Sequence, residues 1–376
     1  MINDDFRSTE TFKLGIIASN CSGGMTSSYL EDQWSGSWEK NLKLAQMADK
    51  AGIDFILPAA RFIGLEGKKD FQGTVLETIT WASALLSKTE NIKVFATMHT
   101  SMNHPIIAAK QIVSMAQIGK NRIGLNIVSE WDQAEYDALG IHLPEDHKTR
   151  YDYAQEWFDL VKKIWKSTEA FNWEGQFFQT KGIYGKPNLK ILPPIFNAAG
   201  SKEGKEFAVR NSDFLFTPIF SKIEDCEIEI QNLKKQAAEI GKNIQVLTCT
   251  HIICRRTEDE AKAEWDRQLK NVDQKTVQHI MDTLFAFSKN VPPETLVNLQ
   301  ERVAIAFGGY PLVGTPEQIA DGLSLLHKTG FAGSTLYFFD YTKEFPYFRD
   351  YVMPILREKQ LLSSSQLKSY HFSEFL

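Results

Sequence analysis

The sequence lacks long hydrophobic runs, dense basic segments and paired cysteines. No window of about 18 apolar residues occurs in the 376 residues, so we expect no membrane-spanning helix. The first residues, MINDDFRSTETFK, do not resemble a signal peptide. A net charge of −5 without a Lys/Arg cluster argues against nucleic acid or an anionic membrane as partner. The four cysteines (Cys21, Cys226, Cys249 and Cys254) form no CxxC motif, which favours a reducing, cytoplasmic setting.

The glycine-rich motifs of nucleotide-binding folds are also missing. Residues 19–24 (SNCSGG) follow the first expected strand, and no GxGxxG occurs, which argues against an open dinucleotide-binding sheet. Residues 200–205 (GSKEGK) are one residue too short for a P-loop. Residues 200–205 still join an expected strand to an expected helix. The free backbone N–H groups at the start of a helix favour the binding of a phosphate. A plain N-cap at Ser201 is the alternative interpretation.

Strand-like and helix-like runs alternate along the chain. Strands are expected at residues 12–18, 53–57, 92–97, 123–128, 194–197, 214–217, 245–253 and 334–339. Helices are expected at residues 38–51, 75–87, 105–118, 150–165, 203–210, 223–240, 258–269, 316–329 and 344–357. Eight strands separated by helices predict an α/β fold, a closed (β/α)8 TIM barrel, with a doubly wound open sheet as the alternative.

The expected barrel is one domain over residues 1–376, with the barrel itself at 12–357 and a C-terminal tail at 358–376. Two stretches interrupt the repeat. Residues 171–193, after the fourth helix, are polar, aromatic and rich in Gly and Pro. Residues 274–313, after the seventh strand, form a mostly helical block. Insertions of this kind at barrel ends commonly act as lids over a site.

Polar residues follow the fourth expected strand, and this segment is the most informative in the chain. The strand at 123–128 gives way to Ser129, Glu130 and Trp131, as at the active-site rim of a β/α barrel. An acidic turn then opens the next helix. Arg150 and Tyr151 are expected in its first turn, where an anion is commonly held.

Several single residues remain open between two interpretations. Glu130 and Glu135 are either site carboxylates at the rim or solvated charges. His99, which ends the third strand, is either a general acid or base near neutral pH or a hydrogen-bonded loop histidine. The spacing of Cys249, His251 and Cys254 suggests a metal, but no fourth ligand is apparent, so we expect no metal site.

Taken together, the motifs resemble those of the bacterial-luciferase-like, flavin-dependent monooxygenases, in particular the dimethyl sulfone monooxygenase and pyrimidine oxygenase branch. The segments that carry the resemblance are 59–62 (AARF), 126–131 (NIVSEW), Glu135 with Gly140, 146–151 (DHKTRY), Gly175 with Phe177 and Phe178, and 312–320 (LVGTPEQIA). The likeness extends from about Phe12 to Arg357.

This resemblance implies roles for individual residues. Ala59 and Ala60 would back a flavin ring, and Asn126 and Glu135 would hydrogen-bond the cofactor. Arg150, Tyr151 and Ser201 match positions that anchor its phosphate. Leu57, Thr97 and Asn126 match an oxygen-binding pocket, and they end three neighbouring strands.

The resemblance also implies an activity. We expect a two-component enzyme that takes reduced FMN from a separate NAD(P)H:flavin reductase, uses dioxygen and oxygenates a small sulfur- or nitrogen-containing molecule. A homodimer or homotetramer is expected. The alternatives are a deazaflavin-dependent dehydrogenase and a non-catalytic flavin-binding protein. Glu130 stands where relatives in this branch usually have glycine, so it either pairs with a protein cation or meets an N–H group of the substrate.

Overall fold

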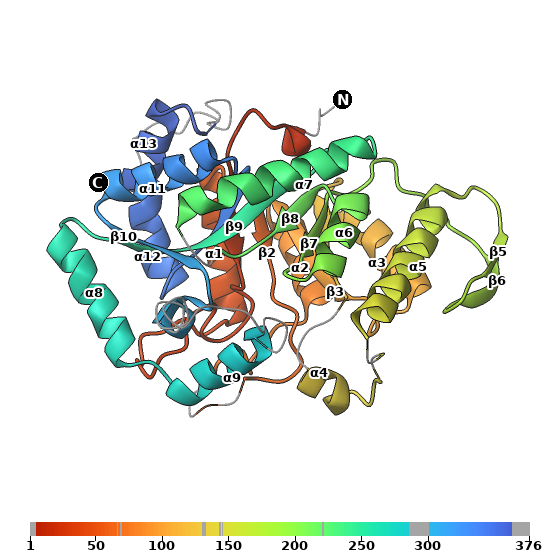
Figure 1. Ribbon diagram of the computed structural model, residues 1–376, viewed down its shortest axis with the longest axis horizontal. Coiled ribbons are helices and arrows are strands. Elements are labelled where there is room, and N and C mark those ends of the chain that lie inside the picture. Colours follow the sequence, from red (N-terminus) through yellow and green to blue (C-terminus); the bar gives the residue numbers. More distant parts are fainter. Residues whose placement is uncertain are drawn as a thin grey trace.

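Eight parallel strands close into a barrel (Figure 1). The computed structural model describes residues 5–65, 67, 70–129, 133–142, 144, 146–219, 222–285 and 301–362. Around the barrel the strands are β1 (Lys13–Ile17), β2 (Phe55–Leu57), β3 (Lys93–His99), β4 (Ile123–Val128), β7 (Ile195–Ala198), β8 (Phe214–Phe216), β9 (Gln245–Cys254) and β11 (Gly333–Tyr337). Pairing of β8 with β9 closes the ring, so the TIM-barrel prediction is confirmed.

Helices surround the strands, and their ends follow from local sequence. The helices of the barrel layer are α1 (Trp38–Ala51), α2 (Thr78–Lys88), α3 (Pro105–Ile118), α5 (His147–Lys166), α6 (Lys202–Asn211), α7 (Glu227–Glu239), α8 (Glu258–Lys270) and α11 (Pro316–Thr329). Helix α11 shows the pattern: Thr315 and Gln318 form a capping box, Pro316 starts the first turn, and Gly330 ends the helix at φ 107°. None of the helices in the described part of the chain is both long and apolar enough to cross a membrane.

Aromatic side chains fill the amino end of the barrel. Phe6, from the short N-terminal helix η1 (Asp5–Arg7), packs against the interior residues Phe55, Leu57, Phe95, Phe196, Phe214 and Leu247. Its ring centroid lies 5.2 Å from that of Phe214 and 5.8 Å from that of Phe55. A side chain at Gly15 would begin 2.3 Å from the Phe55 ring, so glycine is required there. The opposite, carboxyl end of the strands is left for a site.

Both interruptions contain strands that the sequence did not indicate. Residues 171–193 include an antiparallel hairpin, β5 (Phe171–Glu174) with β6 (Gln179–Ile183). The second interruption contains α9 (Gln274–Phe285), helical residues 301–306 and a further strand, β10 (Tyr310–Gly314). Strand β10 pairs in parallel with the second half of β9, beyond the end of β8. Helix α9 and the short helix α4 (Gln133–Ala138) lie at the lower edge of Figure 1, away from the N-terminus.

Four expected helices differ in detail, and the first of them, α2, begins at Thr78 rather than at residue 75. Helix α5 begins at His147 rather than at residue 150, because the Asp146 side chain accepts from Thr149 N at 2.8 Å and caps it. Arg150, the fourth residue of the helix, lies in the first turn as predicted, whereas Tyr151 begins the second turn. The segment 223–240 splits into η2 (Ile223–Cys226) and α7. The last segment is α12 (Tyr341–Tyr347), a π-helical turn η3 (Phe348–Val352) and α13 (Met353–Glu358).

Candidate functional site at the carboxyl end of the barrel

Thr97 joins three neighbouring strands by hydrogen bonds. Its hydroxyl donates to the Pro58 carbonyl at 2.7 Å and accepts from Asn126 Nδ2 at 3.2 Å. Pro58 directly follows Leu57, the last residue of β2. Thr97 and Asn126 are 6% and 7% exposed, so their polar groups are almost fully buried. The structure thus brings together the three residues for which an oxygen pocket was predicted, and that role remains a prediction.

The segment after β2 is held by one asparagine. Asn20 Nδ2 donates to the Ala59 carbonyl at 2.8 Å, and Asn20 Oδ1 accepts from Ala59 N at 2.9 Å. Both backbone groups of Ala59 are thereby fixed. Ala59 and Ala60 are half-buried at the mouth of the barrel, where small side chains leave the backbone accessible to a flat ligand.

Glu135 holds the same segment from the other side. Its Oε2 accepts from Phe62 N at 2.9 Å, and its Oε1 lies 3.3 Å from Arg61 Nη1. Arg61 Nε also donates to Gln72 Oε1 at 2.9 Å. Glu135 is 0% exposed, so this is a buried ion pair whose carboxylate oxygens both have protein donors. The sequence did not indicate this positioning role, because Arg61 lies 74 residues away.

His99 is a hydrogen-bonded, neutral group. Its Nδ1 lies 3.0 Å from the Tyr136 hydroxyl, and both residues are buried. Burial lowers the pKa of His99 to about 4; a backbone hydrogen bond involving Ala60 acts against this, and the nearby Arg61 charge adds to it. At neutral pH the ring is therefore uncharged. Of the two interpretations given above, the geometry favours the hydrogen-bonded histidine that links α4 to the barrel.

Two of the predicted phosphate anchors meet at the start of α6. Ser201 caps the helix, with Oγ accepting from Gly204 N at 3.2 Å. A Cβ at Gly204 would lie 2.5 Å from the Tyr151 hydroxyl and 2.8 Å from Ala199 Cβ. The Tyr151 hydroxyl is thus pressed against the first turn of α6. Hydroxyls beside a helix N-terminus suit an anion, so the residues present fit a phosphate group.

Arg150 lies one residue before Tyr151, and its Nε donates to the Pro144 carbonyl at 2.5 Å. This bond ties the guanidinium to the turn between α4 and α5. Glu130 and the neighbouring Trp131 lie outside the described residues.

His251 and Tyr337 form a buried aromatic pair on β9 and β11 that the sequence did not indicate. His251 has the same strand parity as Leu247 of the interior cluster, so its ring faces the barrel interior. The ring stacks on Tyr337, with centroids 5.0 Å apart and planes at 11°. Burial and the Arg255 charge lower the pKa of His251 to about 3, so it is neutral. The alternation of residues along β9 indicated which face of the strand His251 occupies. Its stacking on Tyr337 depends on the pairing of β9 with β11, which is far away in the sequence.

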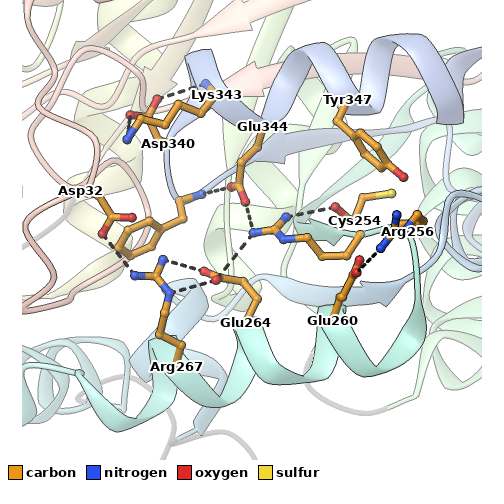
Figure 2. A pocket seen from close by; sticks show the side chains of 12 residues that line it. Asp32, Cys254, Arg256, Glu260, Glu264, Arg267, Asp340, Lys343, Glu344 and Tyr347 are labelled. Carbon is orange, nitrogen blue, oxygen red and sulfur yellow. Dashed lines mark hydrogen bonds and ion pairs between the residues drawn. The ribbon is translucent and has the colours of Figure 1, made fainter.

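A cleft of about 740 Å³ lies outside the barrel, between α8 and α12. Figure 2 shows that its charges satisfy one another. Arg255 Nη2 lies 2.6 Å from Glu344 Oε1 and 3.7 Å from Glu264 Oε2. Arg267 pairs with Glu264 at 2.8 Å and with Asp32 at 3.2 Å. We interpret this cleft as a structural ion-pair network, because its charges are matched.

The rim groups described above are of kinds that can bind and orient a ligand by hydrogen bonds. They are hydroxyls, amides and neutral imidazoles, which donate and accept hydrogen bonds. In the part of the chain that the structure describes, no group of three His, Cys, Asp or Glu residues is placed to hold a metal. An arrangement of this kind suits a bound organic cofactor that brings its own chemistry.

Comparisons with known proteins agree with this geometry. The family model described as "Luciferase-like monooxygenase" matches residues 12–333. The chain is 29% identical over 368 residues to the FMNH2-dependent dimethylsulfone monooxygenase of Pseudomonas fluorescens, covering 95% of this chain and 98% of that protein. It is 26% identical over 363 residues to the pyrimidine monooxygenase RutA of Acinetobacter baylyi, covering 93% and 95%. The crystal structure of DmoA from Hyphomicrobium sulfonivorans has the same fold, with a TM-score of 0.84 and 18% identity over 94% of this chain and 90% of that one.

Proposed function

Because the chain belongs to the luciferase-like monooxygenase family, we propose that it is a reduced-FMN-dependent monooxygenase. It takes the reduced flavin from a separate NAD(P)H:flavin reductase and oxygenates a small sulfur- or nitrogen-containing organic molecule with dioxygen. The names of two relatives, a dimethylsulfone and a pyrimidine monooxygenase, support this class of substrate. The reductase, and a homodimeric or homotetrameric assembly, belong to the same proposal.

The observation that carries the proposal is the group of hydrogen-bond donors at the start of α6. Tyr151, Ser201 and the N–H groups of the first helical turn would hold the FMN phosphate, with Arg150 adding a positive charge from the neighbouring helix. The Tyr151 hydroxyl can lie this close to α6 because residue 204 is glycine; a Cβ at that position would collide with the hydroxyl. Bound in this way, the cofactor would extend from α6 towards the ends of β2, β3 and β4.

The flavin ring would rest on the segment that Asn20 and Glu135 hold rigid. Ala59 and Ala60 present little bulk, so a flat ring can approach their backbone. Asn126 would hydrogen-bond the ring, and Leu57 and Thr97 would border the space for dioxygen. Reduced FMN supplies the electrons that activate dioxygen; the protein residues orient it and exclude water.

The phosphate contact gives the test of the proposal. Arg150→Ala should weaken FMN binding by about 1.5–3 kcal/mol, roughly 10- to 150-fold, because a charge-assisted hydrogen bond is lost. Riboflavin has no phosphate, so it should bind the unchanged protein more weakly and be nearly indifferent to the substitution. Arg256→Ala is the matched control, because the Arg256 side chain is 81% exposed and pairs with Glu260 outside the barrel.

Fluorescence titration with both flavins measures these affinities. Equal losses for FMN and riboflavin would show that Arg150 does not hold the phosphate. The cofactor that co-purifies with the protein separates the alternatives: a deazaflavin would indicate the dehydrogenase. FMN binding without substrate-dependent oxygen use would indicate a non-catalytic flavin protein.

A further part of the proposal concerns Glu130 and the substrate. Glu130 lies outside the residues that the structure describes. If it meets an N–H group of the substrate, Glu130→Gln should lower kcat/KM about 10-fold or more and leave FMN affinity nearly unchanged. An unchanged kcat/KM would leave the pairing with a protein cation as the explanation.

A further inference from the structure

The loop between β2 and α2 folds back on itself at the mouth of the barrel. Its outgoing limb, residues 59–65, begins with the two alanines on which the flavin ring would rest. Its returning limb, residues 71–76, lies beside the outgoing one, since Leu65 N donates to the Phe71 carbonyl at 3.2 Å. Ser22, in the loop after β1, forms two backbone hydrogen bonds of 2.9 Å with the returning limb. The returning limb is therefore a fixed support for the outgoing one.

Gln72 bridges the two limbs through its side chain. Its Oε1 accepts from Arg61 Nε at 2.9 Å, and its Nε2 donates to the Gly24 carbonyl at 2.7 Å. Gln72 is 1% exposed and Arg61 is 7% exposed, so both residues are buried. Arg61 is also paired with Glu135, the buried carboxylate that accepts from Phe62 N. Gln72 thus holds the guanidinium from one side, and Glu135 holds it from the other.

The backbone of Gln72 is in the left-handed region, with a φ of 54°. A residue with a Cβ is strained there, and glycine or asparagine is the usual occupant. Residues held in such conformations cluster at functional sites, where the surrounding structure keeps them in place. Glutamine has an amide that is long enough to reach both Arg61 and Gly24, and glycine has none. Strain that is accepted together with this contact points to a role for the amide.

Phe71 fixes the same point of the chain from the opposite side. It is 2% exposed and belongs to the small hydrophobic cluster of the second interruption, which includes Val272. Its ring centroid lies 6.0 Å from that of Phe307. Because Phe71 is anchored in this cluster, the next residue, Gln72, presents its amide to Arg61 at a fixed place.

We propose that Gln72 is a positioning residue of the flavin site, which holds Arg61 and, through Arg61, the segment that supports the flavin ring. This role rests on the proposed function, in which Ala59 and Ala60 support the ring. Gln72 acts through Arg61 and is therefore not a catalytic residue. The supported part of the cofactor is the ring, which FMN and riboflavin share. Loss of the Gln72 amide should consequently weaken the binding of both flavins alike.

Flavin titrations of Gln72→Met test this proposal. Methionine keeps the length of the side chain but removes the amide, so Arg61 loses its acceptor. A site that is no longer held in its binding geometry binds less tightly, so oxidised FMN and riboflavin should both bind about fivefold or more weakly. The factor should be the same for both flavins, whereas Arg150→Ala should affect FMN alone. The absorption spectrum of bound FMN should also shift towards that of free FMN.

Two further variants separate positioning from general stability. Gln72→Glu keeps the oxygen that accepts from Arg61, so it should retain most of the flavin affinity. Gln72→Gly removes the backbone strain together with the amide, so flavin affinity should fall while Tm stays within a few degrees of wild type. The matched control is Gln360→Gly, because Gln360 also has a left-handed backbone, with a φ of 61°, but is exposed. The next residue, Leu361, accepts from Phe12 N beside the amino end of β1, so Gln360→Gly should keep full flavin affinity.

Hydrogen exchange of the flavin-free protein gives a second readout. The Phe62 amide donates to Glu135 and should exchange faster in Gln72→Met, because the Arg61 partner of this carboxylate is loosened. Gln72→Glu should show wild-type exchange at this amide. The Ile92 amide, which donates to the Asp49 carboxylate, is the internal control and should be unchanged in both variants.

Wild-type affinity for both flavins in Gln72→Met would overturn the proposal, and so would a loss confined to FMN or an equal loss in Gln360→Gly. Flavin affinities that follow Tm through the whole series would also overturn it, because they would assign Gln72 a structural role only. If Gln72→Met does not fold, the glycine and glutamate variants still decide. Wild-type protein that binds neither flavin rejects the proposed function, whereas flavin binding that does not depend on Gln72 rejects only this inference.

Discussion

At the scale of the residue, Thr97 shows how one hydroxyl ties the site to the barrel. It donates to Pro58 and accepts from Asn126. Thr97→Val keeps the volume but removes both bonds, so we expect less product per reduced FMN and a loss of about 1–3 kcal/mol in stability. FMN affinity should stay nearly unchanged. Thr97→Ser, which keeps the hydroxyl, is the control; wild-type product yield in Thr97→Val would mean that the oxygen pocket lies elsewhere.

His251 gives a pH prediction at the same scale. Burial, followed by the Arg255 charge, lowers its pKa to about 3, below the value of about 6.5 expected in the unfolded chain. Between these values the unfolded state binds more protons than the native state, so stability falls as pH decreases from about 6.5 towards 3 and is fully present above 6.5. The loss is at most about 1.4 kcal/mol per pH unit.

Denaturant unfolding at several pH values measures this effect. The stability of His251→Phe relative to wild type should rise steadily below pH 6.5, because the variant lacks the titrating group. A stability difference that does not vary between pH 4 and 7 would contradict the lowered pKa.

The sequence predicted residue roles where the signal is local. Asp146 and Ser201 were in segments expected to start helices, and both are N-caps. The fully buried Glu135 was not predictable, because carboxylates are usually solvated and its partner Arg61 comes from another part of the chain. The stacking of His251 on Tyr337 also depends on strand pairing and not on local spacing.

At the scale of the element, periodicity predicted the eight barrel strands and the helices around them. It did not predict the β5–β6 hairpin, because short strands with mixed polar and aromatic residues resemble a loop. The hairpin depends on Glu156 of α5. Its Oε1 accepts from Trp173 Nε1 and Phe178 N, and its Oε2 from Gln176 N and Phe177 N, all within 3.0 Å.

Replacing Glu156 should loosen the hairpin without unfolding the barrel. Glu156→Gln substitutes an NH2 group for one acceptor oxygen and faces it towards N–H donors, so we expect a local loss of about 1–3 kcal/mol. Burial raises the pKa of Glu156, but its hydrogen-bond donors outweigh this and lower the pKa overall, which agrees with a carboxylate that is held in place.

Hydrogen exchange of the amides of Gln176, Phe177 and Phe178 measures this loss. Exchange should accelerate in Glu156→Gln, whereas Glu174→Gln, at an exposed position in β5, should leave it unchanged. Equal exchange in both variants would show that Glu156 does not stabilise the turn.

At the scale of the whole molecule, the two ends of the barrel have different tasks. The amino end is closed by Phe6 and the aromatic layer, which serve stability. The carboxyl end gathers Thr97, Asn126 and His99 on one side and His251 on the other. Strand and helix alternation was enough to predict this architecture, since parallel strands bring their carboxyl ends together. It was not enough to predict which polar groups would remain unpaired there.

Labelling with ¹⁸O2 tests the central claim most directly. The protein is mixed with FMN, NADH and a general flavin reductase under ¹⁸O2, together with a panel of small sulfur- and nitrogen-containing compounds that includes neutral and anionic members. Mass spectrometry should find a product that carries one ¹⁸O atom and that requires both the protein and reduced FMN. Hydrogen peroxide as the sole product across the panel, or substrate oxidation that proceeds without dioxygen, would contradict a monooxygenase.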